Sequence, residues 1–264
     1  MLYDICSHTD MGLRRGNNED SVEFDVPTNL CVLADGMGGY NAGEVASSMA
    51  TSFIKTELGR WLTNAGDNAQ AKEVRRVMEI CVDSANRSIL DASKANPEYA
   101  GMGTTLVVGV FQEDRLILGH IGDSRCYRLR GGVLHQLTKD HSFLQEQIDA
   151  GAITPEQALT SVNRNLVTRA LGVEEMAFLE SNEYKVEAHD VYLMCSDGLS
   201  DMVSDQKLAD ILHQDDTLEA KSKVLIDTAN AHGGRDNISV LLVRAKPSPA
   251  KPGLLSKLLS PLVP

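Results

Sequence analysis

The chain has 264 residues, of which 42% are hydrophobic, and it carries a formal net charge of −12 at pH 7. This length suits one large domain with a sizeable core, since single domains routinely reach about 250 residues. So acidic a chain lacks the basic surface that binds phosphate backbones, which excludes nucleic acid as a partner. No run approaches the roughly 20 apolar residues of a membrane span, so none is expected. Five scattered cysteines without a C-x-x-C pair indicate a reducing, cytoplasmic location.

Apolar runs with the composition of β-strands recur along the chain and lead into acidic turns. The runs at residues 30–34, 116–121 and 191–195 are followed within two residues by Asp35, Asp123 and Asp197. Residues 104–111 and 238–243 also predict strands, because they are rich in β-branched side chains and lie between turn residues. A weaker strand is predicted at residues 126–130, which two glycines follow.

Helical periodicity marks two long neighbouring segments, residues 44–62 and 69–92. The second has apolar side chains at i, i+3 and i+4 spacing, from Val74 through Cys81 to Ile89. Shorter helices are expected at residues 208–212 and 218–231. Successive strands with helices in pairs predict an α+β fold in which helices cover sheets, and not a parallel βαβ array.

The domain organisation follows from changes in composition. Residues 1–245 form one predicted domain, interrupted at about residues 140–172 by a polar insertion that has the character of a lid. From residue 246 to residue 264 the chain is rich in proline, and we expect a flexible C-terminal tail.

The acidic turns indicate a functional site only when they are considered together. Any one of them is an ordinary turn, because Asp-Gly is a common turn dipeptide. However, Asp35, Asp123 and Asp197 each follow an apolar strand, and strand ends of one sandwich meet at one edge. Crowded carboxylates repel one another, and hard divalent ions such as Mg²⁺ and Mn²⁺ relieve that repulsion through oxygen ligands. Zinc is disfavoured, because no set of histidine and cysteine ligands accompanies these carboxylates.

The order and spacing of eight short segments resemble the bacterial PPM (PP2C-type) metal-dependent serine/threonine phosphatases. These segments are TDMGLRRGNNEDS (9–21), LADGMGG (33–39), AGE (42–44), GMGTT (101–105), GDSR (122–125), LTKDHS (137–142), CSDGL (195–199) and GRDNI (234–238). Each segment is weak by itself, but together they extend from about residue 4 to residue 243. The resemblance implies a four-layer α/β/β/α sandwich of two mainly antiparallel sheets flanked by helix pairs.

The resemblance also implies a metal centre with Mn²⁺ or Mg²⁺. Asp35 would bridge two ions, and the carbonyl oxygen of Gly36 would bind one of them. The shell of the second ion would be completed by Asp20, Asp197 and Asp236. Asp123 and Asp197 would match a third metal site, and Glu19 and Asn237 would orient metal-bound waters.

The implied activity is hydrolysis of phosphoserine and phosphothreonine in proteins by a hydroxide that bridges two metal ions. The guanidinium of Arg15 would grip the substrate phosphate through two parallel hydrogen bonds, a geometry that suits arginine. Its neighbour Arg14 is interpreted as a solvated charge. Phosphoproteins and a bacterial-type serine/threonine kinase are the implied partners, and we expect a monomer.

Two departures from the family pattern and two rival functions remain. Tyr40 stands where many relatives have histidine, so the general acid is unassigned, and the lid lacks the His-Pro that often precedes Arg164-Asn165 in relatives. A signalling pseudoenzyme of the same fold and a calcium-stabilised binding module are the alternatives. A Mn²⁺-dependent phosphopeptide assay with EDTA and Asp35→Asn controls separates all three.

Four further residues have patterns or positions that could indicate a function but do not fit this chemistry. Cys81 and Arg87 match the C-x5-R pattern of cysteine phosphatases, but the segment lacks glycine and is helical, so we interpret Cys81 as a core residue. His120 ends an apolar strand and is interpreted as structural. His141 opens the lid and is a weak candidate for a contact near the site.

Overall fold

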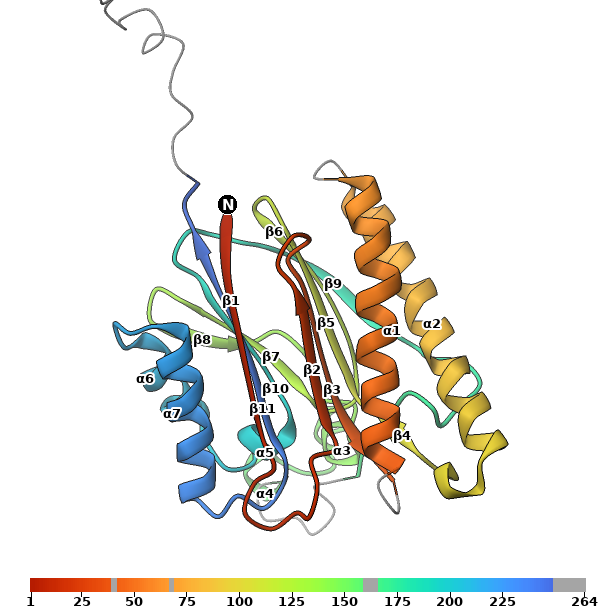
Figure 1. Ribbon diagram of the computed structural model, residues 1–264. Helices are drawn as coiled ribbons and strands as arrows, with labels where there is room; N and C mark the ends of the chain where they lie inside the picture. Colours follow the sequence, from red (N-terminus) through yellow and green to blue (C-terminus); the bar gives the residue numbers. More distant parts are fainter. Residues whose placement is uncertain (39–41, 67–68, 159–165, 249–264) are drawn as a thin grey trace, which may run out of the picture.

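The chain folds as two β-sheets packed face to face, with helices on both outer faces. We describe a computed structural model that covers residues 1–38, 42–66, 69–158 and 166–248. The pair α1 (Ala42–Ala65) and α2 (Ala71–Ala95) covers one sheet, and the pair α6 (Asp205–His213) and α7 (Leu218–Ala231) covers the other (Figure 1). This arrangement confirms the expected α+β class and the α/β/β/α sandwich.

Each sheet is antiparallel throughout its described pairs. The first has five strands in the order β1 (Leu2–Asp10), β11 (Ile238–Lys246), β10 (Val191–Cys195), β7 (Arg125–Arg130) and β8 (Val133–Gln136). The second has the order β2 (Asp20–Asp25), β3 (Leu30–Met37), β5 (Leu106–Gln112), β6 (Arg115–Ile121) and β9 (Glu180–Lys185), and the short β4 (Gly103–Thr104) pairs with β3. The remaining elements are η1 (Pro97–Tyr99), α3 (Phe143–Asp149), α4 (Pro155–Ala158) and α5 (Asp197–Ser200).

Three apolar cores separate the four layers, and alternate residues of one strand serve different cores. Along β3, Leu30 and Val32 pack against α1 and α2, whereas Cys31 and Leu33 face the opposite sheet. A third core lies between the first sheet and helices α5 to α7, and it includes Leu193 and Leu225. A strand covered on both faces needs apolar residues at every position, which explains the unbroken apolar runs in the sequence.

Polar side chains set the starts of several helices. The hydroxyl of Ser204 accepts a hydrogen bond from Lys207 N–H (3.4 Å) at the start of α6, and Thr217 accepts one from Ala220 N–H (3.1 Å) at the start of α7. Such caps satisfy backbone N–H groups that the first turn leaves without partners. The long helices begin and end within three residues of the limits predicted from periodicity.

The sequence identified the interior strands and missed the edges. The four strands without a prediction are β1, β8, β2 and β9, and each is the outermost strand of its sheet. Edge strands are half exposed and carry many polar residues, as in ESNEYK of β9, so they show no apolar run. The run predicted at residues 104–111 divides into β4 and β5, with the break at Thr105.

The insertion is tied to the body of the domain at both of its ends. At its start, His141 N–H donates to the carbonyl oxygen of Gly122 (2.9 Å), and near its end an isolated β-bridge joins Leu171 to Thr104; a second bridge, Ser142 to Val167, holds the two ends together. The last strand of the domain, β11, ends at Lys246, one residue beyond the predicted limit of 245. Residues 249–264, the main part of the predicted flexible tail, lie outside the described residues. No helix in the described part of the chain is long and apolar enough to cross a membrane.

Candidate metal centre

Five aspartates from distant parts of the sequence meet at one edge of the sandwich. The short helix α5 lies at this edge, toward the lower end of Figure 1. Asp20 is the first residue of β2 and lies directly opposite Asp35 of β3 in the strand register. Asp123 follows β6, Asp197 begins α5 directly after β10, and Asp236 precedes β11. Both sheets therefore contribute carboxylates to one place. Asp35 lies within β3, whereas the sequence suggested that it follows the strand.

A cavity of about 200 Å³ opens between these elements. It is lined by Arg15, Glu19, Asp35, Gly36, Met37, Gly38, Thr105, Asp123, Val167, Asp197 and Asp236. Seven of the nine residues predicted to form the site line this cavity. The other two adjoin it: Asp20 is the strand partner of Asp35, and Asn237 follows Asp236 in the chain.

The cavity is electrostatically unfavourable for ionised carboxylates. Burial raises the pKa of Asp35 well above its usual range, and the charges of Asp20 and Asp197 raise it further. Burial, with the charges of Asp123 and Asp236, likewise raises the pKa of Asp197 well above its usual range. The pKa of Asp20 and that of Asp123 rise to about 6, also mainly through burial. A group of acids held so close together needs positive charge to ionise at neutral pH.

The hydrogen bonds of the described residues leave oxygen atoms free for a cation. Asp20 Oδ1 and Asp197 Oδ1 are both buried and have no hydrogen-bond partner. A buried polar atom without a partner is costly, so such atoms mark places where an ion or water is needed. Because the side-chain atoms that could bind a metal ion in the cavity are oxygens, the residues fit hard divalent ions such as Mg²⁺ and Mn²⁺.

Close backbone packing explains the glycines beside the aspartates. A Cβ atom on Gly36 would lie 2.1 Å from the carbonyl oxygen of Gly43 and 2.5 Å from that of Glu19. A Cβ atom on Gly198 would lie 1.9 Å from the carbonyl oxygen of Asn237. Only glycine allows these segments to approach so closely, so the Asp-Gly pairs serve the packing of the site and are not simple hairpin turns.

Hydroxyl groups fix the position of the aspartates, and the sequence analysis assigned them no role. Thr105 holds the backbone of Asp35 twice: its N–H donates to the Asp35 carbonyl (2.9 Å), and its Oγ1 accepts from Asp35 N–H (3.0 Å). The Ser196 hydroxyl donates to Asp20 Oδ2 (2.8 Å). Both residues occur in the quoted segments GMGTT and CSDGL, so their position beside the ligands was the clue available in the sequence.

Arg15 lies at the mouth of the cavity and pairs with Asp236. Its Nη2 donates to Asp236 Oδ2 over 2.6 Å, and the two side chains are 47% and 27% exposed. This hydrogen bond is the main reason that the pKa of Arg15 is raised, so the guanidinium stays charged. Arg14 is exposed, as expected for a solvated charge.

Asn237 holds the loop between β1 and β2 against the start of β11. Its Nδ2 donates to the carbonyl oxygens of Met11 (2.9 Å) and Asn17 (2.8 Å), and its Oδ1 accepts from Glu19 N–H (2.8 Å). The amide thereby positions Glu19, which lines the cavity. Orientation of water by Glu19 and Asn237 stays a prediction.

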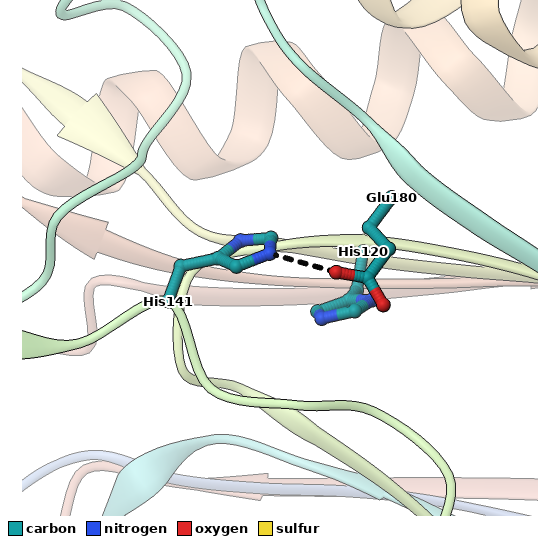
Figure 2. A group of neighbouring side chains, drawn as sticks. All are labelled: His120, His141 and Glu180. Atoms are coloured by element: carbon teal, nitrogen blue, oxygen red, sulfur yellow. Dashed lines mark hydrogen bonds and ion pairs between the residues drawn. The ribbon is translucent and has the colours of Figure 1, made fainter. Parts of the chain in front are cut away.

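A second polar cluster lies beside the centre, where His120, His141 and Glu180 come together (Figure 2). The two rings stack with centroids 4.7 Å apart, and the candidate ligand atoms of the three residues lie within 4.8 Å of one another. Gly122 N–H donates to His141 Nδ1 (3.1 Å), so that nitrogen carries no proton and Nε2 carries it, facing Glu180 Oε2 at 3.4 Å.

This protonation pattern argues against a metal ion at the histidine cluster. An ion at His141 Nε2 would displace the only proton of a neutral ring whose Nδ1 already accepts a hydrogen bond. Burial lowers the pKa of His141, and His120 lowers it further, which favours the neutral ring. His120 Nε2 in turn bonds to the carbonyl oxygen of Lys139 (2.8 Å). Both histidines therefore connect the start of the insertion to the end of β6, next to Asp123. His120 has the structural role that was expected, and His141 makes a contact near the site.

The base of the insertion is also held by an arginine. Arg125 Nε and Nη2 donate to the two oxygens of Asp140 over 2.7 to 3.1 Å, and Arg125 Nη1 donates to Tyr127 Oη (3.0 Å). The two charged side chains are 25% and 12% exposed. This planar, two-point pair fixes the start of the insertion relative to β7.

Cys81 has no part in the cavity. Its side chain packs in the core beneath α2, and burial raises the pKa of its thiol to about 11. A thiol with so high a pKa is a poor nucleophile, which agrees with its interpretation as a core residue. The predictions for Tyr40 and for Arg164-Asn165 concern positions outside the described residues.

Comparison with known proteins identifies similar chains. The family model described as "Protein phosphatase 2C" matches residues 7–230. The serine/threonine phosphatase stp of Listeria monocytogenes is 37% identical over 241 residues, which cover 89% of this chain and 93% of that protein. The serine/threonine protein phosphatase PstP of Mycobacterium tuberculosis is 41% identical, over 92% of this chain and 45% of its own length.

Solved structures agree with these similarities. The serine/threonine phosphatase of S. agalactiae superposes with a TM-score of 0.85 at 36% identity, over 93% of this chain and 100% of that one. The catalytic domain of PstP in complex with two manganese ions superposes with a TM-score of 0.81 at 37% identity, over 93% of this chain and 99% of that one.

Proposed function

This chain belongs to the protein phosphatase 2C family and is a protein-serine/threonine phosphatase, and we propose that its acidic cavity is the catalytic centre. The substrates are phosphoserine and phosphothreonine side chains of proteins. The observation that carries this proposal is the convergence of five aspartates, two with buried oxygens that lack a partner, on one cavity with an arginine at its mouth.

The cavity depends on divalent metal ions, for which we propose Mn²⁺ or Mg²⁺. Asp35 lies centrally among the aspartates and suits a bridging position between two ions, and the Gly36 carbonyl oxygen is a further ligand. Asp20, Asp197 and Asp236 would complete the set, and Asp123 with Asp197 would hold a third ion. When bound, such a pair of ions supplies a bridging hydroxide at near-neutral pH and neutralises charge on the phosphoryl group.

Arg15 is proposed to bind and orient the substrate phosphate. Its present partner Asp236 is also a proposed ligand, and a carboxylate that binds a cation attracts the arginine less. The exposed single hydrogen bond between them is easily exchanged, so the guanidinium can turn to the phosphate. Two parallel hydrogen bonds to phosphate then fix its orientation, which lowers the barrier by positioning.

Several finer assignments stay predictions. The proton donor to the serine or threonine leaving group is unassigned. A serine/threonine kinase is proposed as the opposing enzyme, because this activity needs substrates that such a kinase has phosphorylated. The monomeric state and the cytoplasmic location rest on the sequence alone.

The proposal is tested by turnover of a phosphothreonine peptide by the purified chain. We expect phosphate release with Mn²⁺ or Mg²⁺, none in EDTA, and a severe loss in Asp35→Asn. Isothermal titration with Mn²⁺ separates binding from catalysis, since a pseudoenzyme or a binding module would take up the ion without releasing phosphate. Absence of turnover with bound Mn²⁺ would refute the proposed activity.

A further inference from the structure

A second cavity, of about 210 Å³, adjoins the proposed catalytic cavity. We call it the flanking groove; it is lined by Met37, Ile121 and nine residues between positions 167 and 178. Met37 and Val167 line both cavities, so the two lie side by side. One residue of each charge, Arg169 and Glu174, accompanies an otherwise mainly apolar lining.

The groove exposes large apolar side chains that the fold does not need. Val173, Met176 and Phe178 are 59%, 65% and 60% exposed. Ala177 and Leu179 alternate with them and pack against the core beneath α1 and α2, so the same segment has both an anchored side and an exposed apolar side. Exposed apolar side chains that gather in one place commonly mark a binding surface.

A buried side chain of α2 fixes the backbone that forms the wall of the groove. Asn86 of α2 is 1% exposed; its Nδ2 donates to the carbonyl oxygens of Glu174 (2.9 Å) and Glu175 (3.4 Å), and its Oδ1 accepts from Gly172 N–H (2.7 Å). A buried side chain that satisfies three backbone groups fixes the path of the segment before Met176. The groove is therefore largely formed before any ligand arrives, which reduces the entropy lost on binding.

We propose that the flanking groove binds an apolar side chain of the substrate polypeptide, next to the phosphorylated residue. This inference rests on the proposed function, because the catalytic cavity must hold the phosphate for the groove to receive its neighbour. The volume is below the roughly 300–1,000 Å³ of pockets for separate small molecules and suits a side chain instead. Because Met37 and Val167 line both cavities, that side chain would belong to a residue within a few positions of the phosphorylated one, as an extended chain advances about 3.3 Å per residue.

Matched phosphothreonine peptides test the preference. A single leucine in an otherwise Ser/Gly peptide is moved through the three positions on each side of phosphothreonine, and kcat/KM with Mn²⁺ is compared with that of the all-Ser/Gly peptide. We expect about a tenfold increase at one or two positions, the size given by partial burial of a leucine side chain. Turnover of p-nitrophenyl phosphate, which has no flanking residues, is measured in parallel.

Two variants locate the preference in the groove. The double variant Met176→Ser, Phe178→Ser should reduce the leucine-to-serine ratio to near one, and Val133→Ser, a change of a similarly exposed apolar residue on β8, should leave that ratio unchanged. Each ratio is measured on one preparation, so a change in folding or catalytic power cancels. Met176→Lys should shift the preference from leucine to glutamate at the same position, which a loss of packing would not do.

The outcomes separate the two proposals. Turnover of p-nitrophenyl phosphate and peptides with equal rates for leucine and serine would overturn the groove and leave the phosphatase intact. Absence of turnover on every substrate would overturn the proposed function and this inference with it. A concentration-dependent dimer that Met176→Ser dissociates, without a change in peptide preference, would assign the groove to self-association and overturn its role in substrate binding.

Discussion

Two arginine–aspartate pairs lie beside the acidic cavity, and they differ in geometry and burial. Arg125 binds both oxygens of Asp140 and is one-quarter exposed, whereas Arg15 touches Asp236 through a single hydrogen bond and is almost half exposed. Breaking a partly buried two-point pair leaves a charge without its charged partner, whereas an exposed single contact contributes little to stability. The first pair therefore holds the fold, and the second leaves its arginine free to exchange partners.

The largest expected effect is the loss of activity when Asp236, the aspartate of the exposed pair, is replaced. Asp236→Asn should lower kcat/KM for a phosphothreonine peptide by more than about 1,000-fold, because even outer partners of metal ligands cost about 10–100-fold. In EDTA its Tm should not fall, since the charge of Asp236 raises the pKa of Asp20, Asp35 and Asp197. Thermal unfolding and steady-state kinetics measure both effects. A Tm in EDTA well below that of the unaltered protein would show that the Arg15–Asp236 pair is structural after all.

The second effect concerns stability. Arg125→Ala should lower Tm by about 6–12 °C, from a loss of about 3 kcal/mol at about 2–4 °C per kcal/mol for a chain of this size. Arg60→Ala is the control, because Arg60 forms an exposed pair with Glu57 in α1 and should change Tm by less than about 2 °C. Equal melting of the two variants would contradict the structural role of the pair at Asp140.

The third effect is catalytic without a loss of stability. Arg15→Ala should lower kcat/KM for the peptide by about 100-fold, the usual cost of one donor to a charged transition state, with Tm changed by less than about 2 °C. Arg15→Lys should recover only part of the activity, since lysine keeps the charge but not the two-point geometry. Arg14→Ala is the matched control, and an equal loss there would remove the distinction between the neighbouring arginines.

The smallest effect is the pH dependence of the metal-free protein. The pKa of Asp20 and that of Asp123 are raised from 3.8 to about 6, so their neutral forms favour folding, and that stability is lost as the pH rises through about 6. In EDTA, Tm should therefore fall by at least about 3 °C between pH 4.5 and 7, as these acids ionise. Saturating Mn²⁺ should remove the fall, since the ion binds the ionised forms.

A variant isolates the carboxyl contribution to this trend. The lowered pKa of His141 acts in the opposite direction, because its neutral form is favoured in the fold as the pH rises. Asp123→Asn keeps His141 and removes one raised carboxyl group, so its Tm should depend less steeply on pH in EDTA. A Tm in EDTA that rises across the whole range would contradict the electrostatic account of the cavity.

Much of the fold could be predicted from the sequence. The strands that were not predicted were missed for one common reason. Strands β3, β6, β10 and β11 are interior strands covered on both faces, so burial demands apolar residues throughout and the sequence displays them. The edge strands β1, β2, β8 and β9 are stabilised by a neighbour on one side only and carry polar residues toward solvent. Their pairing depends on distant partners, such as Lys246 for Leu2, which periodicity cannot reveal.

The residues of the candidate site likewise divide into those that the sequence identified and those whose roles only the folded chain shows. The aspartates were identifiable because each lies in or beside a glycine-containing segment whose order along the chain is distinctive. The hydroxyls of Thr105 and Ser196 were assigned no role, and Asn237 was assigned to water and not to the backbone of Glu19, because these roles lie in hydrogen bonds to residues far away in the sequence. Likewise, His120 and His141 show their stacked contact and their protonation only in the folded chain.

The amino-acid sequence by itself determined which side chains carry charge, which runs must be buried and where glycine permits close approach, because these are properties of residues and their near neighbours. Only the tertiary structure decided that Asp20 faces Asp35, that one arginine is held while the other can exchange, and that an apolar groove opens beside the cavity. Those outcomes depend on through-space distances, burial and charge, which arise when strands from both sheets end at the same edge.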